Sequence, residues 1–420
     1  MISKILTASV LAILADTVQA KDWPQWRGPD RTGLSSEKGI IKSWEESPPK
    51  LLWNVKGSGR GYSSVSISDG VLYTSGNFEG GQGVSAFSIE DGKLLWQTPV
   101  TDFAPKHGYQ GARSAPTVDN GHLYVTTSNG VIACISTKGK VVWSKDFKKE
   151  WKGKMMSGWG FSESPLVDGE RVICTPGGNS AFMVSLDKKT GATKWKTKIA
   201  PEDLGKKGKD GAGYGSIVIS NGGGVKQYVQ MTGRGVIGVR AKDGRFMWNY
   251  NKVANSTANI PTPIVDGDHV FCSTGYGTGS ALLKVVKKGG GTTAEEVYFL
   301  KPKILQNHHG GLLLIDGHIY GAHKHNGGDA ICVEMKSGKV KWGPEKGVGN
   351  GSACVTFVDG HLVYRYQSGH VALVKASSGG YELKGSFMPA HQEAESWAHP
   401  VVSDGKLYLR EQDHIMCYEL

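Results

Sequence analysis

Short stretches in which apolar and polar residues alternate recur along the chain, and neighbouring stretches are joined by an Asp-Gly or similar turn. These turns recur at intervals of roughly 43 to 53 residues, at Asp69, Asp119, Asp168, Asn221, Asp266, Asp316, Asp359 and Asp404. Period-two alternation is typical of strands with one buried face, and Asp-Gly between two such strands is a strong hairpin signal, because Gly readily adopts a positive φ. The pattern therefore predicts eight β-hairpins.

A second signature closes many of these units. An eleven-residue phrase with a small residue first, Gly seventh and Trp last occurs five times, at 86–96, 133–143, 185–195, 238–248 and 332–342. Another alternating strand lies between each hairpin and its Trp, so each unit contains four antiparallel strands, as a propeller blade does. Such units bury their faces against one another. We predict an all-β, eight-bladed β-propeller in which each Trp wedges against the adjacent blade, where the small first residue leaves room.

The two ends of the chain share one copy of the phrase. The last strand, 415–420, ends where the Gly-x-x-x-Trp half is due, and a segment ending in Trp occurs near the start, at 49–53. We predict that this N-terminal strand closes the last blade, because pairing the two ends removes an exposed sheet edge. Two blades are degenerate and end in Phe299 and Phe387.

The first twenty residues have the pattern of a cleavable signal peptide. Lys4 precedes an apolar stretch, and a small-x-small cleavage site ends at Ala20. The residue that follows is Lys21, which argues against a lipid-anchored form. No later stretch is long and apolar enough for a membrane helix. We therefore divide the chain into a signal peptide (1–20), an N-terminal extended segment (21–50) and a propeller (51–420), and we expect a periplasmic or secreted monomer.

The net charge indicates which kinds of partner the protein attracts, and the cysteine spacing indicates whether it holds disulfides or metals. The formal net charge of +11 favours anionic partners such as an acidic polymer, although solvated lysine loops would give the same balance. Export argues against nucleic acid. The six Cys residues each lie in a separate predicted strand, without the spacing of a metal or haem motif. We expect buried free thiols, with disulfide pairing as the alternative.

The Gly-x-x-x-Trp phrase resembles the tryptophan-docking motif of the pyrroloquinoline-quinone-like (PQQ-like) β-propeller superfamily, and the resemblance extends from Trp53 to Leu420. That superfamily includes quinoprotein dehydrogenases and non-enzymatic scaffolds such as the propeller of the outer-membrane barrel-assembly machine, so the fold leaves the function open. The resemblance implies a ligand- or protein-binding scaffold of the cell envelope. The alternative is a PQQ-dependent dehydrogenase oxidising an alcohol or a sugar.

Polar and aromatic residues precede the innermost strand of each predicted blade. Such segments meet at one mouth of a propeller channel, where convergent polar and aromatic groups are the default ligand site. A small molecule or an envelope protein would bind there, unless these side chains only cap the channel. The candidate binding residues are Tyr62, Arg113, Glu163, Asn259, His308, His309, Trp397 and His399.

The same segments offer two alternative metal sites. The dehydrogenase resemblance implies Ca²⁺ beside PQQ, with Glu163 and Asn259 as oxygen ligands and Trp397 or Trp159 stacking on the quinone. The chain departs from that family in having no adjacent Cys pair and no Asp in the expected mouth segment. Alternatively, His308, His323 and His325 would hold a metal such as Zn, Cu or Ni. Period-two alternation predicts that His323 and His325 share one strand face.

Overall fold

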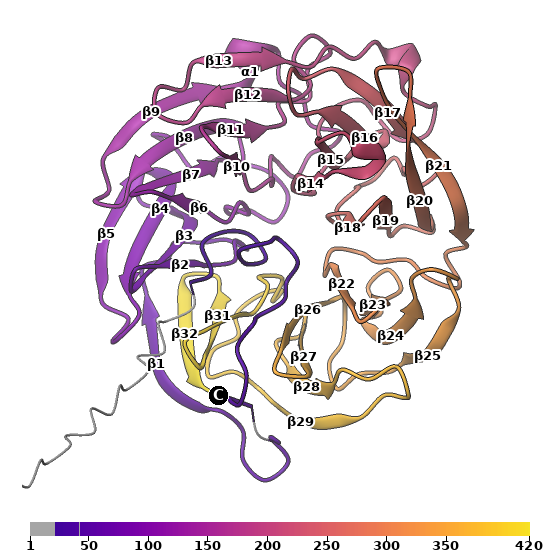
Figure 1. The fold of residues 1–420 in the computed structure, drawn as a ribbon. Coiled ribbons are helices and arrows are strands. Elements are labelled where there is room, and N and C mark those ends of the chain that lie inside the picture. Colours follow the sequence, from indigo (N-terminus) through magenta and orange to yellow (C-terminus); the bar gives the residue numbers. More distant parts are fainter. Residues whose placement is uncertain (1–21, 42) are drawn as a thin grey trace, which may run out of the picture.

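The computed structural model describes residues 22–41 and 43–420, and these residues form a ring of eight four-stranded sheets around a central channel (Figure 1). Neighbouring strands within every sheet are antiparallel and follow one another in the chain, apart from the sheet that contains the two ends. The predicted eight-bladed propeller is therefore confirmed. The predicted signal peptide lies outside the described residues. No helix of the described part is long and apolar enough to cross a bilayer.

The blades follow chain order around the ring. From the inner to the outer strand they are β2 (Ser66–Ser68), β3 (Val71–Phe78), β4 (Gly81–Ser88), β5 (Leu94–Pro99); β6 (Thr117–Asp119), β7 (His122–Thr126), β8 (Val131–Ser136), β9 (Val141–Asp146); β10 (Leu166–Asp168), β11 (Arg171–Cys174), β12 (Val184–Asp187), β13 (Thr193–Lys196); and β14 (Val218–Ser220), β15 (Gln227–Thr232), β16 (Gly235–Arg240), β17 (Phe246–Tyr250).

The second half of the ring repeats this order. Its blades are β18 (Ile264–Asp266), β19 (His269–Thr274), β20 (Gly279–Lys288), β21 (Gly291–Leu300); β22 (Leu312–Ile315), β23 (His318–His323), β24 (Asp329–Glu334), β25 (Val340–Glu345); β26 (Ala353–Val358), β27 (His361–Tyr366), β28 (Val371–Lys375), β29 (Leu383–Phe387); and β30 (Val401–Ser403), β31 (Lys406–Glu411), β32 (His414–Glu419), β1 (Lys50–Lys56). The described helices are α1 (Phe147–Trp151) and the 3-10 turns η1 (Pro201–Asp203) and η2 (Gly222–Gly224).

Asp-Gly turns form the inner hairpins as predicted. Asp69 and Gly70 have φ angles of 50° and 76°, and the pair Asn120-Gly121 has 45° and 75°. Positive φ at both central positions defines the type I′ turn, whose twist matches that of antiparallel strands. The local sequence therefore determines where each blade begins.

The ring closes between the two ends of the chain. Strand β1 pairs antiparallel with β32, in a register that runs from Lys50 opposite Glu419 to Lys56 opposite His414. The outer strand of the last blade thus comes from the N-terminus, as the divided phrase predicts. This pairing covers the sheet edge that β32 would otherwise expose.

Four phrase Trp residues, counting Trp53 of the divided copy, contact the phrase glycine of the blade that follows. The indole rings lie against the sites where a Cβ would stand, in the pairs Trp53–Gly92, Trp96–Gly139, Trp143–Gly191 and Trp195–Gly244. Within its own blade, the first residue Ala86 lies opposite Trp96, whereas Ala133 lies opposite Ser144. Ala133 belongs to the buried cluster against which Trp96 of the preceding blade packs, so a small first residue and the phrase glycine both lie near that Trp.

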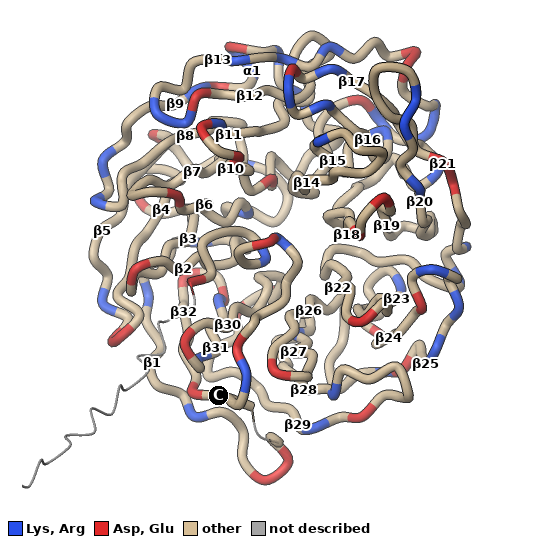
Figure 2. The backbone as a smooth tube through the Cα atoms, in the orientation of Figure 1, with Lys and Arg blue, Asp and Glu red and all other residues tan. Residues whose placement is uncertain are grey.

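Apolar side chains between neighbouring sheets form the core. A typical cluster joins the second and third blades through Ile132, Cys134, Val172 and Val184, all fully buried. The six cysteines are all buried and free, as expected of small apolar side chains on inward strand faces. Figure 2 shows that most Lys and Arg residues lie instead on the outer strands and loops.

The N-terminal segment crosses the centre of the ring (Figure 1, indigo). Trp23 pairs with Ile67 of β2, and Leu34 pairs with Phe357 of β26. Between these anchors, the buried Arg31 guanidinium donates to the carbonyls of Ser164 (3.1 Å) and Ile217 (3.0 Å). Because these carbonyls belong to two different blades, the segment ties the blades together from inside.

Candidate functional site

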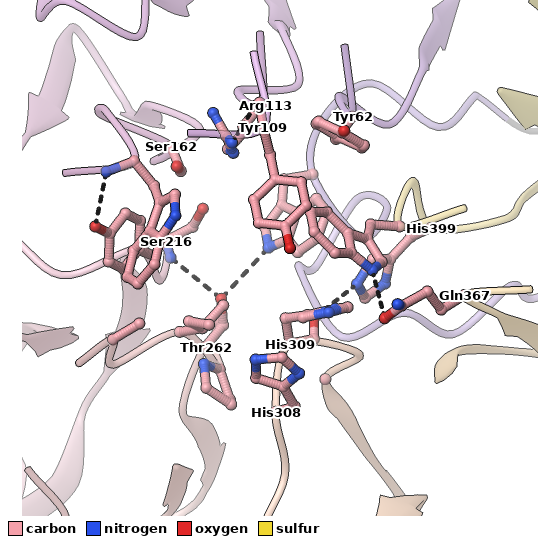
Figure 3. A pocket seen from close by; sticks show the side chains of 18 of the residues that line it. Tyr62, Tyr109, Arg113, Ser162, Ser216, Thr262, His308, His309, Gln367 and His399 are labelled. Carbon is pink, nitrogen blue, oxygen red and sulfur yellow. Dashed lines mark hydrogen bonds between the residues drawn. The ribbon is translucent and has the colours of Figure 1, made fainter. Parts of the chain in front are cut away.

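A cavity of about 370 Å³ lies at one mouth of the channel. Figure 3 shows side chains from several blades pointing into it. Its wall contains seven aromatic side chains and four histidines: Trp26, Tyr62, Tyr109, Trp159, Tyr214, Tyr276 and Trp397, and His308, His309, His325 and His399. Trp26 of the N-terminal segment lies 4.6 Å from His399 between ring centroids, so that segment contributes part of the pocket.

Close backbone contacts hold the entry segments in place. Tyr62 donates its backbone N–H to the Ala112 carbonyl of the next blade (2.8 Å), and Tyr214 does the same to Asn259 (2.9 Å). The preceding residue Gly61 lies so near Ala112 that an added Cβ would stand 2.6 Å from its carbonyl oxygen. Glycine is thus required where two entry segments meet, and each segment positions its neighbour.

Trp397 is the centre of one wall. Tyr62, Tyr109 and His309 surround it at centroid distances of 4.9, 4.8 and 5.0 Å, inclined by 38°, 65° and 63°. Its indole N–H donates to the Gln367 side chain (3.0 Å). These contacts fix the orientation of the ring before any ligand arrives, which reduces the entropic cost of binding.

The histidines form a neutral cluster beside Trp397. His308 shares hydrogen bonds with the Ser352 hydroxyl (2.7 Å) and the Tyr276 hydroxyl (3.0 Å), and its ring lies 4.2 Å from that of His325. Burial lowers the pKa of His308 to about 3, and the pKa of His399 also to about 3. These imidazoles are uncharged at neutral pH and present hydrogen-bonding nitrogens rather than positive charge.

Arg113 supplies a cation to the same wall as Trp397. Its guanidinium lies over the Tyr62 ring, 5.5 Å from the centroid, and donates to the carbonyls of Gly108 (3.1 Å) and Gly111 (3.2 Å). Burial lowers its pKa to about 10, so the group remains protonated at neutral pH.

The pocket brings together six of the eight candidate binding residues predicted from sequence: Tyr62, Arg113, His308, His309, Trp397 and His399. Glu163 and Asn259 do not line it. One carboxylate oxygen of Glu163 accepts from Gln230 (2.7 Å), and the buried other oxygen has no partner. The Asn259 amide donates to the carbonyls of Thr232 and Gly233. Asn259 therefore holds a loop in place.

The predicted set of metal-binding histidines is not assembled. Among the described residues, no group of three or more His, Cys, Asp or Glu side chains is placed to hold an ion. The Asn259 amide is occupied by backbone groups, since its oxygen accepts from Asn255 N–H and its nitrogen donates to Thr232 and Gly233. A calcium site at Glu163 and Asn259 stays a prediction. Of the proposed histidines, His308 and His325 share the pocket.

His323 lies apart from that pair, and the expected shared strand face is wrong. Strand β23 ends at His323, and Lys324 follows with a φ of 71°. The alternation of strand faces stops there, since a left-handed residue turns the chain. His323 is buried and accepts a backbone hydrogen bond from Gln306 (3.3 Å), whereas His325 lies in the pocket wall.

Sequence reasoning missed several lining residues. Trp26 and Arg27 belong to the N-terminal segment, which carried no repeat signal. Tyr276 lies in the Gly275–Gly279 stretch, which looked like an ordinary blade loop, and it has a φ of 55°. The sequence signal was the excess of aromatic residues in segments outside the predicted strands.

Solved structures of two functional kinds share this fold. BamB from Moraxella catarrhalis has a TM-score of 0.61 and 13% identity, with 89% of this chain and 98% of that chain covered. A europium-containing methanol dehydrogenase has a TM-score of 0.64 and 13% identity, with coverage of 93% and 89%. The quinohemoprotein alcohol dehydrogenase from Comamonas testosteroni has a TM-score of 0.63 and 12% identity, with coverage of 95% and 80%.

Identities this low show the fold alone. No curated protein matches the sequence significantly. A family model described as outer membrane protein assembly factor BamB matches residues 80–344. Because that match spans more than half of the chain, the protein belongs to this family of PQQ-like β-propellers.

Proposed function

We propose that this protein is an exported β-propeller that binds a small ligand in the pocket at the channel mouth. The observation that carries the proposal is the aromatic wall around Trp397, whose rings and hydrogen bonds are already in place. A volume of about 370 Å³ falls within the range of ligand pockets, roughly 300–1,000 Å³.

Export and envelope partners belong to the same proposal. The signal-like pattern of residues 1–20 supports export, and the family is described by an outer-membrane assembly factor. An envelope protein that covers the channel mouth is the alternative occupant, and the entry segments would then form its docking surface. The basic outer loops would attract acidic polymers of the envelope.

A ligand screen tests the proposal. Thermal unfolding of the mature protein is measured against a panel of sugars, organic acids, amino acids and nucleosides, because a ligand that binds only the native state raises the melting temperature. We expect a hit that Trp397→Ala abolishes and that Phe103→Ala preserves, since Phe103 is 54% exposed and lies outside the pocket. Hits that survive Trp397→Ala would place binding elsewhere. If no compound of the panel binds and an envelope protein is captured through the entry segments, the small-ligand proposal is overturned in favour of that protein.

The second candidate is a PQQ-dependent dehydrogenase acting on an alcohol or a sugar. Its support is the fold shared with alcohol and methanol dehydrogenases and the presence of both Trp159 and Trp397 in the wall. The difficulty with this candidate is that Glu163 and Asn259 do not line the pocket. Incubation with PQQ and Ca²⁺ followed by dye reduction with an alcohol and sugar panel tests it. Dye reduction by the native protein that is lost in Glu163→Ala would overturn the scaffold proposal. A protein with neither dye reduction nor quinone absorbance would rule out the dehydrogenase.

A further inference from the structure

The pocket is cationic, and its lining contains no carboxylate. Arg27 and Arg113 are the charged side chains among the lining residues at neutral pH, given that the histidines are neutral. Both guanidinium groups donate to backbone carbonyls, Arg27 to Leu312 and Arg113 to Gly108. These carbonyls accept from the terminal nitrogens but leave the net charge in place, and the buried Arg27 Nε has no hydrogen-bond partner among the described residues. The pocket therefore favours an anion and disfavours the quaternary ammonium ligands that other aromatic cages bind.

The lining rings meet at steep angles. Tyr62 is inclined by 38° to Trp397, Tyr109 by 65° to Trp397, and Trp159 by 59° to Tyr214. Because these rings are in contact and inclined, the wall that they form is uneven rather than one flat aromatic face. A sugar ring is thick and puckered, with apolar C–H faces and hydroxyl groups around its rim. It can rest on such a wall and reach the wall's hydroxyl and amide groups.

The cation and the best stacking surface are adjacent. The Arg113 guanidinium lies over the Tyr62 ring, 5.5 Å from its centroid. The centroid of Tyr62 is in turn 4.9 Å from that of Trp397. Near the opposite end of this wall, Gln367 holds the indole of Trp397. A sugar ring resting on Trp397 would thus have its substituents within the field of Arg113.

We propose that the ligand of this pocket is a saccharide that carries an acidic group, with its ring against Trp397 and Tyr62 and its carboxylate or sulfate toward Arg113. This inference rests on the proposed ligand-binding function and specifies the class of ligand. The formal net charge of +11 would increase the local concentration of such anions around the molecule.

Calorimetric titration with matched oligosaccharides tests the ligand class. The probes are oligogalacturonate, a sulfated galactan oligosaccharide and a neutral galacto-oligosaccharide of equal length, with benzene-1,3,5-tricarboxylate as a flat aromatic anion. We expect at least one acidic saccharide to bind about tenfold or more tightly than the neutral one, because charge-assisted hydrogen bonds are the strong ones. The two acidic probes distinguish carboxylate from sulfate.

Two variants locate the charge. Arg113→Gln should remove the preference for the acidic saccharide and leave the weak binding of the neutral one. Lys149→Gln removes one charge from a side chain that is 85% exposed and lies outside the pocket lining, and it should change neither affinity. Trp397→Ala should lower the affinity for the acidic and the neutral saccharides alike.

The outcomes separate the ligand class from the proposed function. Equal affinity for acidic and neutral saccharides, or Trp397-dependent binding of the aromatic tricarboxylate alone, would overturn the acidic-saccharide proposal while leaving a ligand pocket. Failure of every saccharide probe overturns the ligand class as well. The broad ligand screen with Trp397→Ala decides the proposed function independently.

Discussion

Replacing Gly244 by alanine should destabilise the propeller by more than its backbone geometry alone accounts for. Gly244 has a φ of 75°, and an added Cβ would stand 2.4 Å from the Trp195 ring of the preceding blade. Alanine in the left-handed region costs about 1–2 kcal/mol, and overpacking costs about 1–3 kcal/mol. We therefore expect the free energy of unfolding to fall by about 2–5 kcal/mol.

Gly121→Ala is the matched control. Gly121 has the same φ of 75°, but nothing lies within 4 Å of the place where an added Cβ would stand. Its substitution should cost only the backbone strain, about 1–2 kcal/mol. The difference between the two variants isolates the contact between blades, at about 1–3 kcal/mol.

Urea unfolding followed by far-ultraviolet circular dichroism measures both variants and the double variant Trp195→Ala/Gly244→Ala. In the Trp195→Ala background the clash is absent, so Gly244→Ala should cost no more than Gly121→Ala does in the native protein. A double-mutant cycle gives the coupling directly. Equal shifts for Gly244→Ala and Gly121→Ala, or strict additivity with Trp195→Ala, would refute the packing of Trp195 on this glycine.

Three further predictions concern closure, a buried ion pair and pH. Deleting residues 50–56 should lower the melting temperature and release the last blade from cooperative unfolding, because β32 loses its partner; unchanged calorimetric cooperativity would contradict this. Glu411→Ala should lower the free energy of unfolding in urea by about 3–5 kcal/mol, because the fully buried Arg365 guanidinium, 2.8 Å away, loses its carboxylate partner. An unchanged free energy of unfolding would refute the pairing. Burial raises the pKa of Glu163 from 4.5 to about 7, so the native state binds the extra proton and stability contributed by this group falls as pH rises from 4.5 to 7. The stability of the native protein minus that of Glu163→Gln should decline across that window, and a flat difference would show that Glu163 ionises normally.

The blades were predictable because their signals are local. An Asp-Gly turn with two positive φ angles, such as that at Asp69, sets a hairpin from adjacent residues alone. The divided phrase similarly located the closing strand β1. The contact made by each Trp was harder to assign, since pairing Trp96 with Ala86 inside the blade and with Gly139 across blades requires the register of both sheets.

Candidate binding residues were predictable only in part. Tyr62, Arg113 and Trp397 stood out as polar or aromatic residues before inner strands, and the structure places them on one wall. Asn259 stood out for the same reason, yet its amide donates to the backbone of the β15–β16 turn in the preceding blade. Side-chain direction in a loop depends on hydrogen bonds that residue type does not specify.

The sequence alone determined the blade count, the strand order and the closure of the ring, because alternation and turn chemistry act over a few residues. Only the tertiary structure decided that Arg31 joins two blades, since the carbonyls of Ser164 and Ile217 come together only when these blades are side by side. It likewise decided the pocket, whose walls come from segments up to hundreds of residues apart. The charge of these walls and the angles between their aromatic side chains are set by closure of the propeller, and the proposed class of ligand rests on both.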